Sequence, residues 1–292
     1  MKIFSVNAGY FKLDGGAMFG VVPKSIWNKL NPADENNMCS WALRCLLIQQ
    51  DDKLILIDNG MGDKQDEKFF GHYYLHGNDT LDKSLAQHGF TKDDITDVVL
   101  THLHFDHCGG SICRVSGNLV PAFKNATYWS NEQHWQWAIK PNDREKASFL
   151  KENILPIKES GQLKMIELPE IHEATGQGEV TVVRSGIIDT LSFIVVNGHT
   201  AAMMLPVISV NGKTIVYTAD LLPSVAHIPL AYVMAYDMFP LTTLKEKKSF
   251  LEWALAKECI LFFEHDPVNE CCTLMANEKG IRSKDIFTLS EI

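Results

Sequence analysis

The chain has 292 residues, of which 46% are hydrophobic, and a formal net charge of −9. The apolar share is enough for a sizeable core, and the negative charge argues against a protein that binds nucleic acid through its phosphates. Seven cysteines without a C-x-x-C pair fit a reducing compartment better than a disulfide scaffold. No apolar run approaches the length of a membrane span, and the N-terminus is not typical of a secretory leader. We therefore expect a cytoplasmic protein with no membrane and no nucleic-acid partner.

The N-terminal part is predicted to be a strand followed by a long loop. Lys2–Val6 is typical of a strand, and the glycines that follow favour a loop over about residues 8–40. Loops of this length are usually functional or disordered. The apolar residues Met18, Phe19 and Trp27 are consistent with a wall over a substrate site or with a partner surface. They are equally consistent with a loop that simply packs against the core.

The next elements are a pair of strands and a helix. Trp41–Gln49 and Lys53–Ile57 are apolar stretches, and the polar residues between them form a hairpin signal. Thr80–His88 is typical of a helix, because a threonine can cap its start and a glycine follows its end.

The most informative stretch follows the apolar run Ile95–Leu100, which is typical of a buried strand. It has the pattern H-x-H-x-D-H, formed by His102, His104, Asp106 and His107. Imidazoles and a carboxylate suit zinc and similar divalent ions. Four ligands this close cannot all bind one tetrahedral ion that also keeps an open position. Alternate residues can: His102 and His104 suit one ion, and Asp106 and His107 suit a second. The cysteine that follows, at position 108, is interpreted as a packing residue rather than a ligand.

The rest of the chain is predicted to contain helices and then a second group of strands. The helices are expected over a segment that Ser130 caps and that contains Trp135 and Trp137, over Asp143–Asn153, and over Thr242–Lys257. The strands are expected at Asn125–Trp129, Lys164–Leu168, Val180–Arg184, Leu191–Val196, Ala202–Val210, Thr214–Thr218 and Ile260–Phe263. His134, in the first helix, could be a pocket residue, but a histidine in such a place is more often on the surface, and we interpret it so. This alternation fits two packed sheets with helices outside.

Further candidate ligands stand at the ends of these strands, in Gly198-His199-Thr200, Thr218-Ala219-Asp220 and Glu264-His265-Asp266. Together with the H-x-H-x-D-H stretch and Ile57-Asp58-Asn59-Gly60, they resemble the signature of the metallo-beta-lactamase superfamily over most of the chain. The resemblance implies an α/β fold, a four-layer αββα sandwich of two mixed sheets with helices on the outer faces. We expect residues 1–292 to form this single domain, with the long N-terminal loop near the active site.

The resemblance also implies a role for each ligand. One divalent ion is held by His102, His104 and His199; a second is held by Asp106, His107 and His265; Asp220 bridges both, and Asp58 orients the motif. Zinc is the expected metal, with iron, manganese or cobalt as alternatives. Two ions that share a carboxylate and a water make a strong nucleophile at neutral pH. Asp106 and Asp220 are therefore the expected catalytic residues, Asp106 as a proton carrier to the leaving group.

Two positions distinguish among the activities of such proteins. True beta-lactamases of this superfamily carry a cysteine where this chain has Asp220, so the resemblance argues against a penicillinase. The segment with Asp14-Gly15-Gly16 most resembles a subgroup of quorum-signal lactonases and methyl parathion hydrolase-like enzymes. Lactonases often place a tyrosine three residues after the bridging aspartate, whereas this chain has Pro223.

We therefore predict a metal-dependent hydrolase that acts on a lactone or a related ester, similar to N-acyl-homoserine lactonases and to quorum-quenching enzymes. Its substrate is a small molecule, and the predicted pocket contains Met18, Phe19, Trp27 and Phe105. Organophosphate triester hydrolysis is the main alternative, followed by thioester hydrolysis and by a non-catalytic metal-binding protein of the same fold. A homodimer is left open.

Overall fold

The computed structural model describes residues 1–169 and 180–292. These residues divide into two compact units. Unit 1 comprises Met1–Phe11 and Ala42–Glu167, and unit 2 comprises Lys12–Trp41 and Leu168–Ile292. Within the described residues, no helix is long and apolar enough to cross a membrane. All seven cysteines are free. The single domain over 1–292 stays a prediction.

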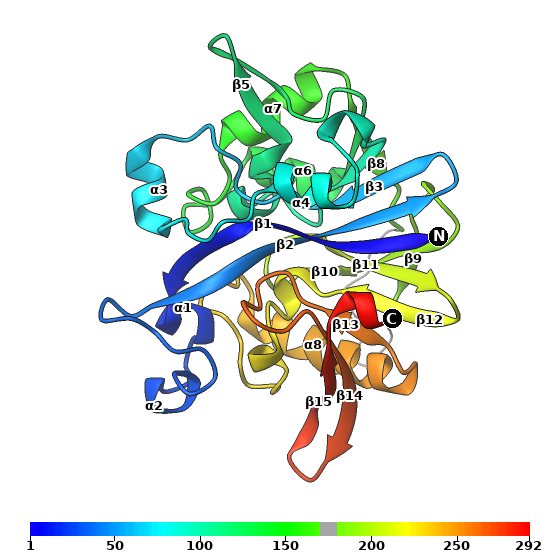
Figure 1. Ribbon diagram of the computed structural model, residues 1–292. Coiled ribbons are helices and arrows are strands. Elements are labelled where there is room, and N and C mark those ends of the chain that lie inside the picture. Colours follow the sequence, from blue (N-terminus) through cyan, green and yellow to red (C-terminus); the bar gives the residue numbers. More distant parts are fainter. Residues whose placement is uncertain (170–179) are drawn as a thin grey trace. The chain divides into compact units, whose positions relative to one another are not determined.

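The first sheet has six strands in the order β1-β2-β3-β4-β7-β8 (Figure 1). It is mixed, because β3, β4, β7 and β8 run parallel to one another whereas β2 is antiparallel to β3. The elements up to its last strand, apart from two short helices in unit 2, are β1 (Lys2–Asp14), β2 (Met38–Gln50), β3 (Lys53–Ile57), α3 (Glu67–Tyr73), α4 (Leu81–Gln87), η1 (Lys92–Asp94), β4 (Asp97–Val99), α5 (Phe105–Cys108), η2 (Gly109–Ser111), β5 (Ile112–Val115), β6 (Asn118–Pro121), β7 (Thr127–Asn131), α6 (Glu132–Ile139), α7 (Lys151–Glu159) and β8 (Leu163–Ile166).

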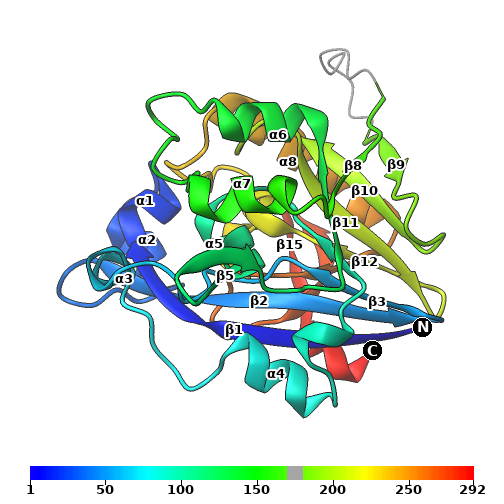
Figure 2. The same ribbon diagram turned by 90° about the horizontal axis from the view of Figure 1, so that it is seen from above.

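The core of unit 1 lies where α4, α6 and α7 cover one face of this sheet (Figure 2). Leu85 of α4, Trp135 of α6 and Ile157 of α7 are buried there with Leu47 and Leu56 of the strands. Each such side chain contributes roughly 1.5–3 kcal/mol when it leaves water. Burial of these apolar stripes, more than helix propensity, holds such short helices in place.

Two predictions in this unit need correction. The helix expected over Asp143–Asn153 is instead α7, which begins at Lys151. Residues before it form a single turn, because the side chain of Asn142 accepts the N–H groups of Arg144 and Glu145 and offers the backbone an alternative to a helix. The expected cap Ser130 is also wrong, since α6 is capped one residue later, by Asn131.

The N-terminal segment is more regular than we predicted. The expected loop over 8–40 begins inside β1, which continues to Asp14. Asp14 then accepts the Ala17 N–H and caps α1 (Gly15–Phe19), and α2 (Lys24–Trp27) follows. β1 runs on because it pairs along the equally long β2, a contact that no local signal in the sequence encodes.

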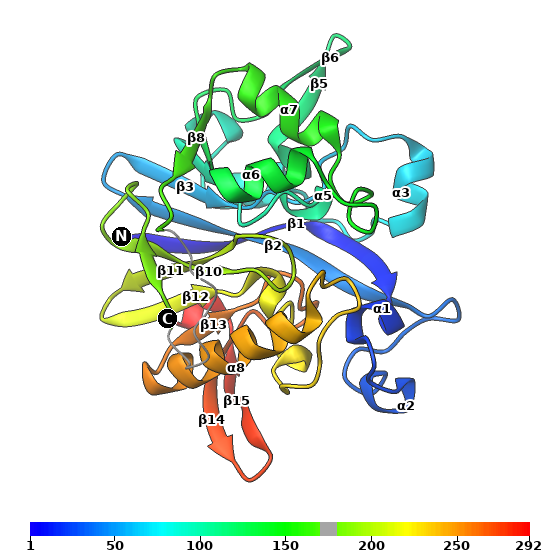
Figure 3. The same cartoon turned by 180° about the vertical axis from the view of Figure 1, so that it is seen from behind.

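The second sheet has seven strands in the order β15-β14-β13-β12-β11-β10-β9 and belongs to unit 2. It is also mixed, because only β12 and β13 are parallel. Its elements are β9 (Val182–Arg184), β10 (Leu191–Val196), β11 (Met203–Val210), β12 (Lys213–Tyr217), η3 (Ala219–Leu221), η4 (Val225–His227), α8 (Pro240–Ala256), β13 (Ile260–Phe262), β14 (Cys271–Asn277), β15 (Gly280–Phe287) and η5 (Leu289–Glu291). The helix α8 lies along this sheet (Figure 3).

Local signals predicted several elements of unit 2 well. Asn211 and Gly212 both have positive φ, of 51° and 75°, as the hairpin turn between β11 and β12 requires. The last helix begins at Pro240, two residues before the expected cap Thr242, because a proline fits the first turn of a helix. The hairpin of β14 and β15 was not predicted.

Candidate metal centre

The H-x-H-x-D-H motif follows β4, and one carboxylate from the neighbouring strand holds it. Asp58 follows β3, which pairs in parallel with β4. Its Oδ1 accepts the Thr101 N–H at 2.8 Å, and its Oδ2 accepts the Thr101 hydroxyl at 2.7 Å. The same Oδ2 lies 3.1 Å from Nδ1 of His107. Asp58 therefore contacts both the start of the motif and one of its imidazoles.

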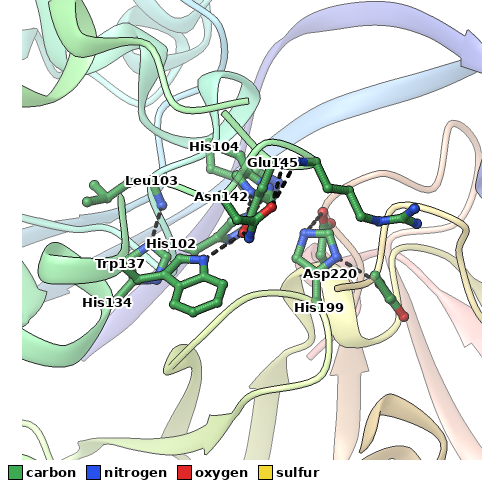
Figure 4. Close-up of polar contacts among 12 residues, drawn as sticks. His102, Leu103, His104, His134, Trp137, Asn142, Glu145, His199 and Asp220 are labelled. Carbon is green, nitrogen blue, oxygen red and sulfur yellow. Dashed lines mark hydrogen bonds and ion pairs between the residues drawn. The ribbon is translucent and has the colours of Figure 1, made fainter. Parts of the chain in front are cut away.

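In His102 and in His104, one ring nitrogen contacts a side chain outside the pair, and the other faces the imidazole of the other histidine. Nδ1 of His102 lies 3.0 Å from the Thr101 hydroxyl, and Nε2 of His104 lies 2.9 Å from Oε1 of Glu145. The remaining two nitrogens, Nε2 of His102 and Nδ1 of His104, are 3.1 Å apart. Glu145 is itself held by Trp137, whose indole N–H donates to Oε2 at 2.6 Å (Figure 4). These contacts fix the orientation of both rings.

The short helix α5 carries the other two residues of the motif. Because Nδ1 of His107 faces Asp58, its Nε2 lies on the opposite side of the ring, 3.8 Å from Oδ2 of Asp106. His107 is fully buried, whereas Asp106 keeps 8% of its surface exposed. Nε2 of His107 and the carboxylate of Asp106 therefore lie close together, and Asp106 is the more exposed of the two.

Two side chains behind the motif have structural contacts. His134 is buried and accepts the Leu103 N–H at 2.8 Å through Nε2, so its interpretation as a surface residue is wrong. The thiol of Cys108 donates to the Leu103 carbonyl at 3.3 Å. Burial raises the pKa of Cys108 to about 12, and a neutral buried thiol is a packing group rather than a ligand.

Unit 2 carries the remaining candidate ligands, each at the end of a strand. Asp220 follows β12, and its two oxygens face different imidazoles: Oδ2 lies 3.1 Å from Nε2 of His199, and Oδ1 lies 3.1 Å from Nε2 of His265. The second nitrogen of His199 lies 2.9 Å from Oδ1 of Asp237. Burial lowers the pKa of His199, but Asp220 and Asp237 outweigh it and raise this pKa to about 10. The surroundings of His199 therefore strongly favour a positive charge.

The chemistry of these residues fits divalent metal ions. All seven predicted ligands are buried and belong to clusters of histidine and carboxylate groups that can hold an ion. His104, His107 and His199 each have one ring nitrogen on a carboxylate. Metal-binding histidines are oriented in this way, with the other nitrogen left for the ion. Two of these outer carboxylates, Glu145 and Asp237, were missed by the sequence analysis, because neither stands in a recognisable motif.

Glycines are needed in the site because the backbone approaches its neighbours too closely for a side chain. A Cβ on Gly109 would lie 2.2 Å from the carbonyl oxygen of Met61, and one on Gly110 would lie 2.3 Å from that of Asn59. The two glycines after the motif thus allow it to pack against the segment that follows Asp58.

Phe105, one of the predicted pocket residues, belongs to an aromatic cluster in unit 1. Its ring lies 5.3 Å from that of Phe69 and 4.6 Å from that of Tyr73, both in α3. Burial raises the pKa of Tyr73 to about 12, with a smaller effect from the charge of Asp106. The phenol is therefore neutral at physiological pH, and the cluster is an uncharged surface next to a candidate ligand.

The other predicted pocket residues, Met18, Phe19 and Trp27, are buried in unit 2. Phe19 stacks on Trp27 with ring centres 5.5 Å apart, and on His227 at 4.6 Å. His227 is held in turn by the Ser224 hydroxyl and the Met18 carbonyl. These contacts are those of a packed core, and the pocket role of the three residues stays a prediction.

The sequence profile of the metallo-beta-lactamase superfamily matches residues 44–265, a span that holds Asp58 and all seven candidate ligands. This chain belongs to the metallo-beta-lactamase superfamily. Its α/β fold, with two mixed sheets and helices, is that of the superfamily, and its histidine-rich groups are consistent with a dinuclear metal site. The predicted family and fold are thereby confirmed.

Relatives within the superfamily include the N-acyl homoserine lactonase of Bacillus thuringiensis, which is 26% identical over 165 residues. That match covers 53% of this chain and 56% of the lactonase, so the chain spans about half the length of the curated relatives it matches.

Similar solved structures cover nearly the whole chain. A probable metal-dependent hydrolase from Staphylococcus aureus has a TM-score of 0.83 at 27% identity, over 98% of this chain and 96% of that one. A dizinc quorum-quenching lactonase, solved in complex with a product, has a TM-score of 0.76 at 22% identity, over 98% of this chain and 95% of that one. The second likeness concerns the fold alone.

Proposed function

We propose that this superfamily member hydrolyses a lactone or a related ester of a small, partly apolar molecule. The proposed centre holds two divalent ions, most simply zinc, through His102, His104, Asp106, His107, His199, Asp220 and His265. The observation that carries the proposal is the division of the two Asp220 oxygens between the imidazoles of His199 and His265, each at 3.1 Å. A carboxylate placed in this way can bridge two ions.

The reaction requires that a water oxygen attacks the ester carbonyl carbon and that the ring C–O bond breaks. When bound, the two ions supply an activated water at neutral pH and a clamp on the attacked group. The chain supplies the proton transfer: the leaving oxygen needs a proton, and Asp106 is the group in the motif that can carry it.

The exposed fractions of the candidate ligands indicate which of them a substrate can approach. His104, Asp106 and Asp220 keep 6%, 8% and 7% of their surface exposed, whereas His102 and His107 are fully buried. The exposed edges therefore belong to the proposed bridging carboxylate, the proposed proton carrier and one imidazole. The ligands that keep this small exposed fraction are the ones we propose to face the substrate.

An uncharged, partly apolar substrate is supported by the aromatic cluster of Phe69, Tyr73 and Phe105, because Phe105 immediately precedes Asp106. Aromatic walls contribute apolar contact area with few polar demands. The lactonase relative of Bacillus thuringiensis supports the same substrate class. The proline at position 223, where lactonases often have a tyrosine, is a departure from the lactonase pattern and is why other esters are included in the test.

The test is metal-restored hydrolysis. The protein is stripped with a chelator, reloaded with zinc, manganese, iron or cobalt, and assayed with N-acyl homoserine lactones of increasing chain length, an aryl ester and a phosphate triester. We expect the lactones to be hydrolysed with the highest kcat/KM, and hydrolysis to disappear on chelation and return with metal. Restored activity on the phosphate triester alone would instead assign a phosphotriester hydrolase. No restored hydrolysis of any substrate would contradict the proposal.

A further inference from the structure

The long helix α8 contacts the backbone that carries His199. The carboxylate of Glu246, in α8, accepts the Asn197 N–H at 2.8 Å through Oε1 and the Gly198 N–H at 2.9 Å through Oε2. Both of its oxygens are thus used on the two residues just before His199. Two backbone N–H groups that donate to one carboxylate hold this end of the loop in place.

The same loop lies directly on the beginning of α8. A Cβ on Gly198 would fall 2.3 Å from the backbone nitrogen of Thr243, so only glycine fits there. The carbonyl of Gly198 accepts the Phe239 N–H at 2.8 Å, and the carbonyl of His199 accepts the Met238 N–H at 3.0 Å. The backbone on both sides of the His199 ring is therefore anchored to α8 and to the residues that lead into it.

The next residue of the helix, Lys247, holds the segment that supplies the partner of His199. Lys247 is fully buried, and its ammonium group donates to the carbonyls of Pro229 and Tyr232 at 2.9 and 2.8 Å. That segment continues to Asp237, whose carboxylate lies 2.9 Å from Nδ1 of His199. Glu246 thus holds the backbone just before His199, and Lys247 holds the segment that leads to Asp237.

Burying Lys247 costs stability. A buried ammonium group loses its hydration, and two carbonyl contacts offset only part of that loss. An apolar side chain at position 247 would pack α8 against the sheet without this cost. We propose that Glu246 and Lys247 are positioning residues for His199, which set the affinity of the chain for the ion that this histidine binds. The proposal rests on the assignment of His199 as a ligand.

The expected size of the effect follows from other outer partners of metal ligands, whose loss typically weakens metal binding by about 10- to 100-fold. Glu246→Gln keeps the size of the side chain but replaces one acceptor by an amide donor that faces a backbone N–H. Glu246→Asp keeps both oxygens and withdraws them by one methylene. Lys247→Met keeps the length and removes both hydrogen bonds.

The experiment measures cobalt(II) binding to the full chain by competition with a chelator and by the visible spectrum of the bound ion. The melting temperature of the metal-free protein is measured on the same samples. Glu252→Gln and Lys248→Met are matched controls, because both residues are exposed on α8. His199→Ala is included to test the ligand assignment separately.

We expect Glu246→Gln to weaken one of the two cobalt binding steps by about 10- to 100-fold and to alter its spectrum. Glu246→Asp should show a smaller effect on the same step, Lys247→Met about a tenfold effect, and the controls none. If Glu246→Gln does not fold, the aspartate and methionine variants decide the question by the same measurement.

A lower melting temperature with both cobalt affinities unchanged would overturn the proposal, because it is the result of a merely structural role. If His199→Ala leaves both binding steps unchanged, the assignment of His199 and with it the proposed dinuclear site would be wrong. If His199→Ala removes one step while the Glu246 and Lys247 variants retain it, only the positioning role is wrong.

Discussion

At the scale of single residues, Asp220 is the side chain on which the proposed chemistry most depends. Its carboxylate divides its two oxygens between two imidazoles. A negative group in this place offsets the repulsion between two cations and sets their separation. The outer carboxylates Glu145 and Asp237 orient the rings but do not share this role, since each contacts a single histidine.

Asp220→Asn should reduce kcat by orders of magnitude and weaken the second metal. The variant keeps the size of the side chain but loses its charge, and metal affinity follows ligand charge. Excess metal should restore activity only in part. Metal content and kcat are to be measured on the same sample, with the exposed Asp189→Asn as the control. An active variant with two ions would show that the bridge lies elsewhere.

His265→Ala and Cys108→Ser should have opposite outcomes. The first removes an imidazole from one ion, so activity should be lost. The second replaces a buried, neutral thiol that donates to a backbone carbonyl, and a hydroxyl can make the same contact. Most activity and both ions should remain in the serine variant. Loss of an ion from that variant, measured by elemental analysis, would add Cys108 to the ligands.

His227 should make the protein less stable in acid. Burial lowers the pKa of this imidazole to about 3, against about 6.5 in the unfolded chain. Between these values the unfolded state binds a proton that the folded state does not, so stability falls as the pH falls from about 6.5 toward about 3. The slope is about 1.4 kcal/mol per pH unit.

The His227→Phe variant tests this prediction, because it keeps the ring that stacks on Phe19 and removes the titrating group. The free energy of unfolding is to be measured by urea titration at several pH values for both proteins. The difference between wild type and variant should shrink as the pH falls. A difference that does not change with pH would contradict the assignment of a neutral, buried imidazole.

At the scale of elements, the short helices α1 and α2 determine how the N-terminal segment is held. Phe19, at the end of α1, is fully buried and stacks on Trp27 of α2 and on His227 of η4. A backbone hydrogen bond adds to these ring contacts: the Ala235 N–H donates to the Ala17 carbonyl at 2.8 Å. This segment is therefore anchored to the one that follows Asp220, within unit 2.

Phe19→Ala should destabilise the protein by about 3–5 kcal/mol, the usual cost of removing a fully buried phenylalanine. Val21→Ala is the matched control, because Val21 is 92% exposed in the same segment, and it should change the free energy of unfolding by less than about 0.5 kcal/mol. Chemical unfolding measures both. A raised KM for long acyl lactones with unchanged stability would instead assign Phe19 to the substrate pocket.

At the scale of the whole molecule, the candidate ligands are spread along the chain from His102 to His265. Local folding of one segment therefore cannot supply the full set. The proposed metal ions should stabilise the folded protein as a whole, because they bind the native state and not the unfolded chain.

Elemental analysis of metal-saturated protein should find about two divalent ions per chain. Chelation should lower the melting temperature, and added zinc should raise it again, because ligands that bind only the folded state stabilise it by mass action. A saturated stoichiometry of one ion, or a melting temperature that does not respond to chelator, would contradict the dinuclear assignment.

Most of the strands, the turn between β11 and β12 and the ligand candidates could be predicted from the sequence, because their signals are local. The H-x-H-x-D-H pattern lies within six residues, and His199, Asp220 and His265 each follow an apolar strand. Glycine after Asn211 marks a turn whatever surrounds it. The resemblance that these motifs carry was enough to predict the superfamily and its fold.

The partners of the ligands were decided by the tertiary structure alone. Glu145 is 41 residues from His104, Asp237 is 38 from His199, and Glu246 is 49 from Asn197. No local pattern encodes such pairs, since they arise only when packing brings distant segments together. The same reason explains the burial of His134 and the course of β1. The sequence by itself determined which side chains are candidate metal ligands, and the packing of the chain decided which carboxylates contact them.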